Sequence, residues 1–234
     1  QAMNAGFLAT IGLGIVLLQS CNTLPPDDQG SGWTPTMRVS PGWRLDFESG
    51  LPRSDVYYNM GTHDVVLQRN YDQPLSGGGD LKLSAVLNGT DREGWAGVWV
   101  KDPSDLDMDA SGATGLRFKF KSSSARNIQV MLSSLAYPDF QNGAKLTGSF
   151  AATKGVQSVE LMFSDFTYPS WLFKSGQLCA SPQGAGTYCT TTMAEVLARV
   201  NAIQFQIDPR WNDAGVADED WAAIQIDDVQ FLFQ

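Results

Sequence analysis

Two adjacent aspartates interrupt the last apolar stretch of the sequence. In "IQIDDVQFLF", Ile224 and Ile226 share one strand parity, whereas Val229 has the opposite parity. The apolar face therefore changes side at Asp227 and Asp228, which predicts a β-bulge or kink. Carboxylates buried without partners destabilise a fold. These two must therefore reach solvent at a sheet edge, pair with Arg side chains or backbone N–H groups, or hold a cation.

The charge, the histidine content and the motifs of the sequence argue against several classes of function. The chain of 234 residues has a formal net charge of -9 and no run of Lys and Arg, which argues against nucleic-acid binding. His63 is the only histidine, so histidine-based catalysis or zinc binding has little to work with. No G-x-S-x-G, H-E-x-x-H, P-loop or dinucleotide motif is present. Acidic residues are plentiful, so composition alone leaves a glycosidase open, although binding without catalysis is favoured.

The N-terminal residues 1–20 form an uncharged, largely apolar segment with the length of a signal-peptide hydrophobic region. The motif "LQSC" resembles the lipobox of bacterial lipoproteins. This resemblance implies that Cys21 is lipidated and that the protein is exported and tethered on the periplasmic or outer side of a bacterial envelope. The alternatives are an uncleaved membrane anchor and a buried core strand.

The two remaining cysteines, Cys179 and Cys189, bracket "ASPQGAGTY", a run of small and turn-forming residues. An even pair in an exported protein predicts a disulfide. Closing so short a loop would stabilise the fold by about 2–3 kcal/mol. The alternative is a pair of free thiols in a cytosolic protein.

The elements that must position these residues are short strands. Residues 21–42 are rich in Pro, Gly, Asp and Thr and predict a flexible tether, so the folded domain is expected over 43–234. Residues 190–201 predict one helix, with Met193, Val196, Leu197 and Val200 at helical spacing and a threonine as N-cap. Ten short apolar or alternating runs separated by turn residues predict an all-β sandwich. They are 43–48, 65–70, 81–87, 95–101, 115–121, 127–134, 145–152, 157–163, 202–208 and 224–233.

Five segments resemble, in their order along the chain, a known group of domains. They are "LDFESG", "SGATGLRFKFKSSSARNIQVML", "GVQSVELMFSDF", "VNAIQFQID" and "IQIDDVQF". Together they are similar to the galactose-binding-like sandwiches of family 11 carbohydrate-binding modules and of complex I intermediate-associated protein 30 type domains. The resemblance covers about Trp43 to Phe233 and implies a jelly-roll β-sandwich.

The resemblance also implies a structural Ca²⁺ where the first strand meets the last. Calcium takes six to eight oxygen ligands, which carboxylates and loop carbonyls such as those of "SGGGDLKL" can supply. The alternative is that these acids are edge residues paired with Arg44 or Lys82. The candidate metal ligands are Asp46, Glu48, Asp80, Asp227 and Asp228.

Strand parity predicts where a ligand would bind. In the runs 95–101, 127–134 and 202–208 the apolar parity marks the core, so the other parity faces outward. The outward face combines aromatic, amide and hydroxyl groups, which suit a neutral polyol. Loop aromatics add to it, although part of that set must be packing. The predicted ligand-binding residues are Trp99, Gln129, Met131, Ser133, Gln204, Gln206, Asp208, Trp211, Tyr137 and Trp171.

The leading prediction is therefore non-catalytic binding of a β-glucan-like polysaccharide by a membrane-tethered sandwich. The alternative is a structural or interaction subunit of a bacterial envelope complex, with the aromatic loops as a protein interface. The two differ in whether the face that carries Trp99 and Gln204 is an open groove or is covered.

Overall fold

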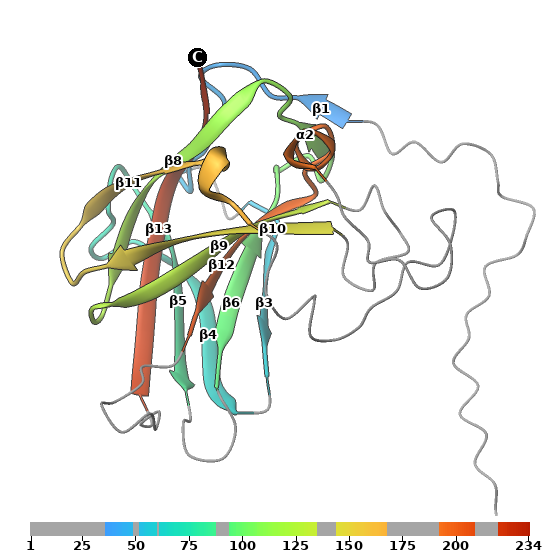
Figure 1. Ribbon diagram of the computed structural model, residues 1–234. Helices are drawn as coiled ribbons and strands as arrows, with labels where there is room; N and C mark the ends of the chain where they lie inside the picture. The colour runs from blue at the N-terminus through green and yellow to red at the C-terminus, as the bar shows by residue number, and fades with distance from the viewer. Residues whose placement is uncertain are drawn as a thin grey trace, which may run out of the picture. The chain divides into compact units, whose positions relative to one another are not determined.

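The computed structural model describes residues 36–48, 52–59, 61–87, 94–134, 144–167, 192–208 and 220–234. They belong to one compact unit, Thr34–Gln234, and form two large β-sheets, a two-stranded sheet and one short α-helix (Figure 1). The all-β prediction with a single short helix is confirmed. In this part of the chain no helix is long and apolar enough to cross a membrane.

The first large sheet has five antiparallel strands in the order β10-β9-β12-β6-β3 (Figure 1). Its central strand, β12, pairs with β6 on one side and β9 on the other. The bounds are β3 Ser54–Tyr58, β6 Ala96–Val100, β9 Arg126–Ser134, β10 Ala144–Ala152 and β12 Ala202–Ile207.

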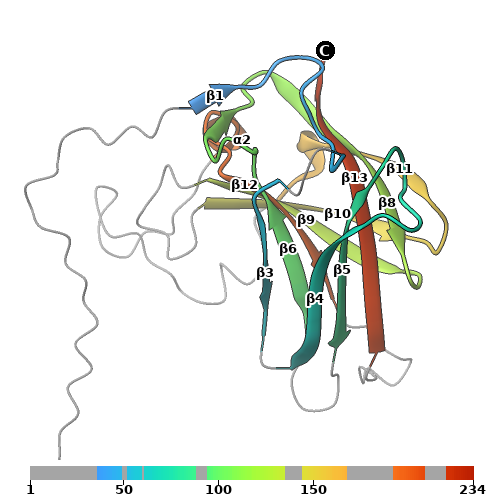
Figure 2. The same cartoon turned by 180° about the vertical axis from the view of Figure 1, so that it is seen from behind.

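The second large sheet has the order β11-β8-β13-β5-β4 (Figure 2). The short strand β2 also pairs with β13. Because β2 pairs with Val229 and Gln230 in the C-terminal half of β13, a strand near the start of the sandwich meets the last strand, as the resemblance implies. The bounds are β2 Arg44–Leu45, β4 Thr62–Asn70, β5 Asp80–Leu87, β8 Ala113–Ser122, β11 Gln157–Met162 and β13 Asp220–Phe233.

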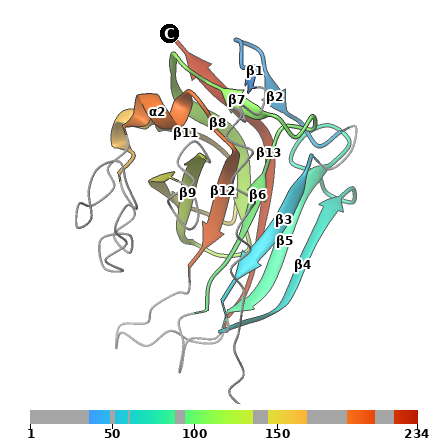
Figure 3. The same ribbon diagram turned by 90° about the vertical axis from the view of Figure 1, so that its right-hand side faces the viewer.

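The core lies between the two large sheets, which Figure 3 shows as two layers. The ring of Phe118 on β8 packs edge-to-face against two other rings. Its centroid lies 5.1 Å from that of Phe205 on β12 and 5.5 Å from that of Phe150 on β10. The predicted core parity is confirmed on β12, where Ile203, Phe205 and Ile207 are fully buried. The opposite parity of β12, which carries Gln204 and Gln206, therefore faces outward.

The predicted bulge in the last strand is confirmed. The register between β13 and β8 shifts between Asp227 and Gln230, and Asp228 has a φ of 52°. Aspartate tolerates this left-handed backbone conformation better than most residues. The bulge lets Ile226 and Val229, which differ in parity, both point into the core.

The predicted helix exists but is shorter than its apolar pattern. Helix α2, Met193–Leu197, begins with a capping box in which Thr192 and Glu195 exchange hydrogen bonds. Val196 and Leu197 are buried, as their spacing predicts. The helix stops before Val200, which instead forms a β-bridge to Met108. A single 3-10 turn, η1 Phe163–Asp165, follows β11.

The predicted tether boundary at residue 42 is wrong at its C-terminal end. Strand β1, Thr36–Arg38, pairs in parallel with β7, Asp107–Asp109, and Val39 is buried in the core. Met37 and Val39 alternate with polar residues, so this stretch has an apolar parity of its own. The sandwich therefore starts before Trp43.

Candidate functional site

The outward face of the five-stranded sheet brings the predicted ligand-binding residues together in two rows. In one row Gln129, Gln206 and Gly97 lie in register across β9, β12 and β6. In the other row Met131, Gln204 and Trp99 lie in register across the same strands. Strand β3, which the sequence pattern did not predict, extends these rows with Tyr57 and Asp55, respectively.

Asp208 orients two of the amides. Its carboxylate accepts hydrogen bonds from Gln129 Nε2 and from Gln206 Nε2, the latter at 2.8 Å. Hydrogen bonds to a carboxylate are stronger than those between neutral groups, so both amides are fixed. Each glutamine then keeps its Oε1 for another donor. Asp208, Gln129 and Gln206 are all partly exposed.

Tyr57 lies directly over Gly97. A Cβ atom at position 97 would be 2.3 Å from Tyr57 Cζ, so only glycine leaves room for the ring. The Tyr57 ring also contacts Trp95, at 5.7 Å between centroids. Burial and, secondarily, the charge of Asp208 raise the pKa of the Tyr57 hydroxyl, which therefore stays protonated. This hydroxyl is buried without a hydrogen-bond partner.

Trp99 is partly exposed beside this row. The ammonium of Lys101 lies 5.4 Å from its ring centroid, a cation–π contact that restrains the indole. Lys101 also forms an ion pair with Asp105 at 3.5 Å, and Arg53 pairs with the same carboxylate. Trp99 is thus held in place by a small charged network.

Three predicted ligand-binding residues are buried rather than open to solvent. Met131 is 2% exposed, Ser133 4% and Gln204 8%. Their outward parity is as predicted, but parity gives only the side of the sheet and says nothing of what lies over it. The Ser133 hydroxyl donates to the Ala202 carbonyl at 3.3 Å. The face is therefore neither wholly open nor wholly covered, and its accessible part lies toward β3 and β6.

Two further polar atoms on this face are buried without a partner, namely Gln204 Oε1 and Thr147 Oγ1. Thr147 lies on β10 in register with Met131, and so continues the row of Gln204. With the Tyr57 hydroxyl, this makes three unsatisfied polar atoms on one face of the described chain. Buried polar groups in folded proteins normally have partners, and ordered water is the usual partner where the protein supplies none.

Several predicted residues lie outside the described part of the chain. They are Tyr137, Trp171 and Trp211 of the ligand-binding set, and Cys21, Cys179 and Cys189.

The five predicted metal ligands divide into groups with different surroundings. Asp46 pairs with Arg44 at 3.3 Å, which matches the alternative interpretation. Asp228 pairs with Lys119 at 2.8 Å and lies 3.6 Å from Arg44. Burial raises the pKa of Asp228, but hydrogen bonds from Lys119 and Ser76 outweigh it and the pKa falls below its usual value. Asp46 and Asp228 are therefore balanced by cations.

Asp80 and Asp227 are different, since both are almost completely buried. Asp80 Oδ2 accepts hydrogen bonds from Leu75 N at 2.7 Å and from Asn70 at 3.3 Å, whereas its Oδ1 has no partner. Asp227 accepts a hydrogen bond from the Ser76 hydroxyl. Burial raises the pKa of both carboxyls, and the charge of Asp227 raises that of Asp80 further.

The fifth residue, Glu48, approaches the glycine-rich turn before β5. Its Oε1 occupies the space that a side chain at Gly77 would fill, 1.2 Å from an ideal Cβ position. Gly77 has a φ of +57°, so a larger residue would be strained there as well. Within the described residues, however, no three acidic, His or Cys side chains are grouped as metal ligands. The fit to calcium is thus partial: two buried acids and one unsatisfied oxygen.

Comparison with known proteins identifies the fold. No protein-family model and no curated protein matches the chain. A family 11 carbohydrate-binding module from Clostridium thermocellum, solved with a β-1,3-1,4-mixed-linked tetrasaccharide, aligns with a TM-score of 0.54 and 18% identity, covering 81% of this chain and 94% of the module. A family 30 module of a Clostridium thermocellum cellulosomal cellulase aligns with a TM-score of 0.50 and 12% identity, covering 81% and 98%. The chain therefore has the β-sandwich fold of family 11 and family 30 carbohydrate-binding modules.

Proposed function

We propose that this protein binds a neutral polysaccharide of the β-glucan type without cleaving it, on the outward face of the five-stranded sheet. The observation that carries the proposal is the pair of glutamines, Gln129 and Gln206, fixed by Asp208 next to the rings of Trp99 and Tyr57. We name these five residues the amide–aromatic face.

This combination suits a sugar chain. A pyranose offers C–H groups on its faces, which pack on an aromatic ring, and hydroxyls at its edge, which need donors and acceptors. Trp99 supplies the ring, and the free Oε1 atoms of Gln129 and Gln206 supply acceptors. Because Asp208 already orients the amides, little side-chain entropy is lost when a ligand binds.

The structural neighbours support the proposal. A module with the same fold was solved with a mixed-linked tetrasaccharide, a ligand that has hydroxyls and no charge. The described cation beside Trp99 does not select an acidic ligand, because Lys101 is paired with Asp105.

Binding is favoured over hydrolysis because the carboxylates on this face already accept hydrogen bonds from the protein. Glycoside hydrolysis uses two carboxyl groups, roughly 5–10 Å apart, that act on the bond between them. On this face Asp208 is engaged by two amides, and Asp55 Oδ1 accepts the backbone N–H of Val56. Both acids therefore have structural hydrogen bonds.

The test is isothermal titration of the protein with a mixed-linked β-1,3-1,4-glucan oligosaccharide, with a mannan oligosaccharide as control, and a reducing-end assay on the same samples. We expect saturable glucan binding and no new reducing ends. Release of reducing ends would make the protein a glycosidase. Failure to bind either glycan would favour the alternative role as a subunit of an envelope complex.

Membrane tethering is a second, separate proposal that rests on the apolar residues 1–20 and on "LQSC". We propose that Cys21 is lipidated and holds the sandwich at a bacterial envelope. Labelling of cells with an alkyne-bearing fatty acid should mark the protein, and Cys21→Ala should remove the label. Labelling that survives this substitution would contradict the lipidation site.

We also propose a structural Ca²⁺ beside Asp80 and Asp227. Two buried acids of like charge destabilise each other unless a cation or protons compensate them. The unpartnered Asp80 Oδ1 supports a missing ligand at this point. Bound there, Ca²⁺ would neutralise the pair and link β5 to β13. Asp46 and Asp228, which are paired with Arg44 and Lys119, are not part of the proposed ligand set.

A further inference from the structure

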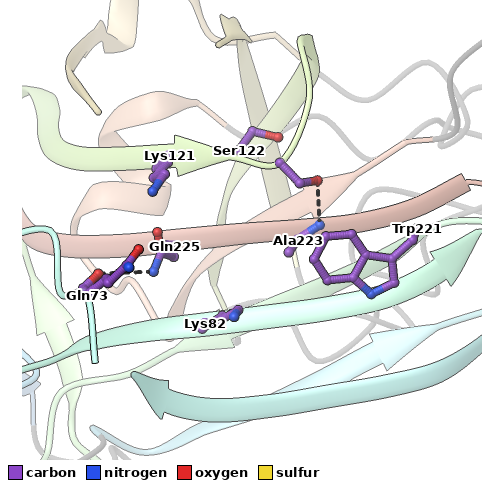
Figure 4. A pocket seen from close by; sticks show the side chains of 8 residues that line it. Gln73, Lys82, Lys121, Ser122, Trp221, Ala223 and Gln225 are labelled. Carbon is purple, nitrogen blue, oxygen red and sulfur yellow. Dashed lines mark hydrogen bonds between the residues drawn. The ribbon is translucent and has the colours of Figure 1, made fainter. Parts of the chain in front are cut away.

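The other large sheet carries a pocket that the proposed function does not use. It has a volume of about 190 Å³ and lies on the outward face of the six-stranded sheet, formed mainly by β5, β13 and β8 (Figure 4). Pockets for drug-sized ligands measure roughly 300–1,000 Å³, so this one suits a single ring of a longer chain.

One end of the pocket is formed by Trp221. The residues of β13 alternate between core and surface, which places Trp221, Ala223 and Gln225 on the outward side. Trp221 is 56% exposed, whereas Ala223 is only 7% exposed. A small residue between a tryptophan and a glutamine leaves a hollow beside the exposed ring (Figure 4). An exposed indole next to a hollow is a platform for stacking.

Two lysines flank the glutamine. Gln225 lies in register with Lys82 on β5 and with Lys121 on β8. Since neighbouring strands are about 4.8 Å apart, the two lysine Cα atoms are separated by roughly 10 Å. An anion placed over Gln225 can therefore be reached by both ammonium groups. Gln225 itself is held by a hydrogen bond to the Gln73 carbonyl at 3.4 Å.

These lysines differ from the other cations on the same sheet. On β8, Arg117 pairs with Glu160 at 2.7 Å and Lys119 pairs with Asp228 at 2.8 Å. Among the described residues, neither Lys82 nor Lys121 has an acid within ion-pair distance, although Lys82 acts on Asp80 from farther away. The described part of the pocket lining contains no acidic side chain. In a chain with 25 acidic and 16 basic residues, a described lining with two such lysines and no acid favours an anionic ligand.

We propose that this pocket binds a hexuronic acid unit of an acidic polysaccharide. The sugar ring stacks on Trp221, its carboxylate lies between Lys82 and Lys121, and its hydroxyls meet Gln225 and Ser123. Lysine contributes as a point charge, so the binding energy depends on ionic strength. This site lies on the opposite sheet from the amide–aromatic face. The two proposed sites are therefore independent, and each can be tested without the other.

The test is titration of the full chain with a galacturonic acid hexamer and, as the neutral probe, with a mannan oligosaccharide of equal length, which the amide–aromatic face is not expected to bind. We expect Trp221→Ala to weaken uronate binding by about ten- to hundredfold, by analogy with the loss of a stacking aromatic from nucleic-acid complexes. Lys121→Gln should weaken it by about fivefold, the value of one partly screened charge. Added salt should weaken uronate binding to the unsubstituted protein. It should also reduce the difference in affinity between that protein and Lys121→Gln.

Arg117→Gln is the matched control. It removes a cation from the same face of the same strand as Lys121, but this cation is already paired with Glu160. It should leave uronate binding unchanged, and Trp99→Ala should do so as well. Thermal midpoints check that each variant is folded. Uronate binding that survives both Trp221→Ala and Lys121→Gln would overturn the proposal, as would an equal affinity of this pocket for the neutral probe. Loss of glucan binding on Trp99→Ala together with retained uronate binding would separate the two sites.

Discussion

Trp99 and Gln204 lie directly opposite each other on β6 and β12, yet the tryptophan is partly exposed and the glutamine is 8% exposed. The boundary between the accessible and the buried part of the proposed binding face therefore runs between these two side chains. The proposed ligand position is therefore over β3, β6 and the end of β12 and β9 that carries Gln206 and Gln129, and away from Met131.

Asp208 is the first residue whose substitution should separate positioning from contact. Asp208→Asn replaces one acceptor oxygen by an amide donor, so at least one of Gln129 and Gln206 loses its orientation. We expect glucan affinity to fall by about tenfold, which corresponds to about 1.4 kcal/mol. The titration measures it, and Glu160→Gln on the opposite sheet is the control. Equal affinities of Asp208→Asn and the unsubstituted protein would show that the two amides do not contact the glycan.

Calcium binding should appear as a change in thermal stability. A chelator should lower the thermal midpoint and added Ca²⁺ should restore it, because an ion at about 100 times its Kd stabilises a fold by about 2.7 kcal/mol. Asp80→Asn should abolish this response. In chelator it should also raise the midpoint, since it removes a buried charge whose raised pKa reflects burial and the charge of Asp227.

Asp46→Asn serves as the matched control for the calcium experiment. Asp46 is partly exposed and paired with Arg44, so its removal should leave the response to Ca²⁺ intact. A midpoint that is the same with chelator and with calcium would contradict the metal site and leave Asp80 and Asp227 as an unbalanced buried pair.

Asp109 gives a prediction about acid stability. Hydrogen bonds from the Ser111 hydroxyl and backbone N–H lower its pKa below the ordinary 3.8. A lowered pKa in the folded state stabilises the protein above the unfolded-state pKa, and this stability is lost as the pH falls through the folded-state pKa. Asp109→Asn should therefore cost about 0.5 kcal/mol at pH 7, a small value because the group is partly exposed.

Urea denaturation between pH 7 and pH 3 measures this effect, with Asp72→Asn as a control for the loss of an exposed charge. The difference between the protein and Asp109→Asn should stay constant down to about pH 5 and shrink below about pH 4, where the carboxyl of the unfolded state takes up a proton before that of the folded state. A difference that grows in acid would have the wrong sign.

Sequence patterns predicted the side of the sheet on which each residue lies, because a period of two is a property of the strand itself. Ile203, Phe205 and Ile207 are in the core, and the phase change at Asp227 is a bulge. Exposure was predicted less well, since the burial of Met131 and Gln204 depends on what packs over the strand. Parity also could not tell which acids would find cations: Asp228 is paired with Lys119, whereas the adjacent Asp227 is buried.

Tyr57 shows why one part of the site was missed. Its strand starts within Pro52, Arg53, Ser54 and Asp55, residues with turn character, so no strand was predicted there. The alternation of Asp55, Tyr57 and Asn59 with Val56 and Tyr58 is the signal that could have found it. The unpaired hydroxyl of Tyr57 and its fit over Gly97 arise only from the pairing of β3 with β6.

The cysteine pair remains a prediction from the sequence. If Cys179 and Cys189 are joined in the exported protein, a non-reduced digest should contain a cross-linked peptide that disappears on reduction. Removal of the disulfide should lower the free energy of unfolding by about 2–3 kcal/mol. Alkylation of both thiols without prior reduction would show that the disulfide is absent.

The glucan affinity of Trp99→Ala tests the central claim most directly, with Tyr58→Ala as the control, since Tyr58 is an exposed aromatic next to Tyr57 in the same strand. We predict that Trp99→Ala raises the Kd for a mixed-linked β-1,3-1,4-glucan oligosaccharide by about ten- to hundredfold, by analogy with base stacking, while the thermal midpoint changes little. Tyr58→Ala should leave the Kd unchanged. A folded Trp99→Ala protein that binds the glucan as tightly as the unsubstituted chain would contradict the account.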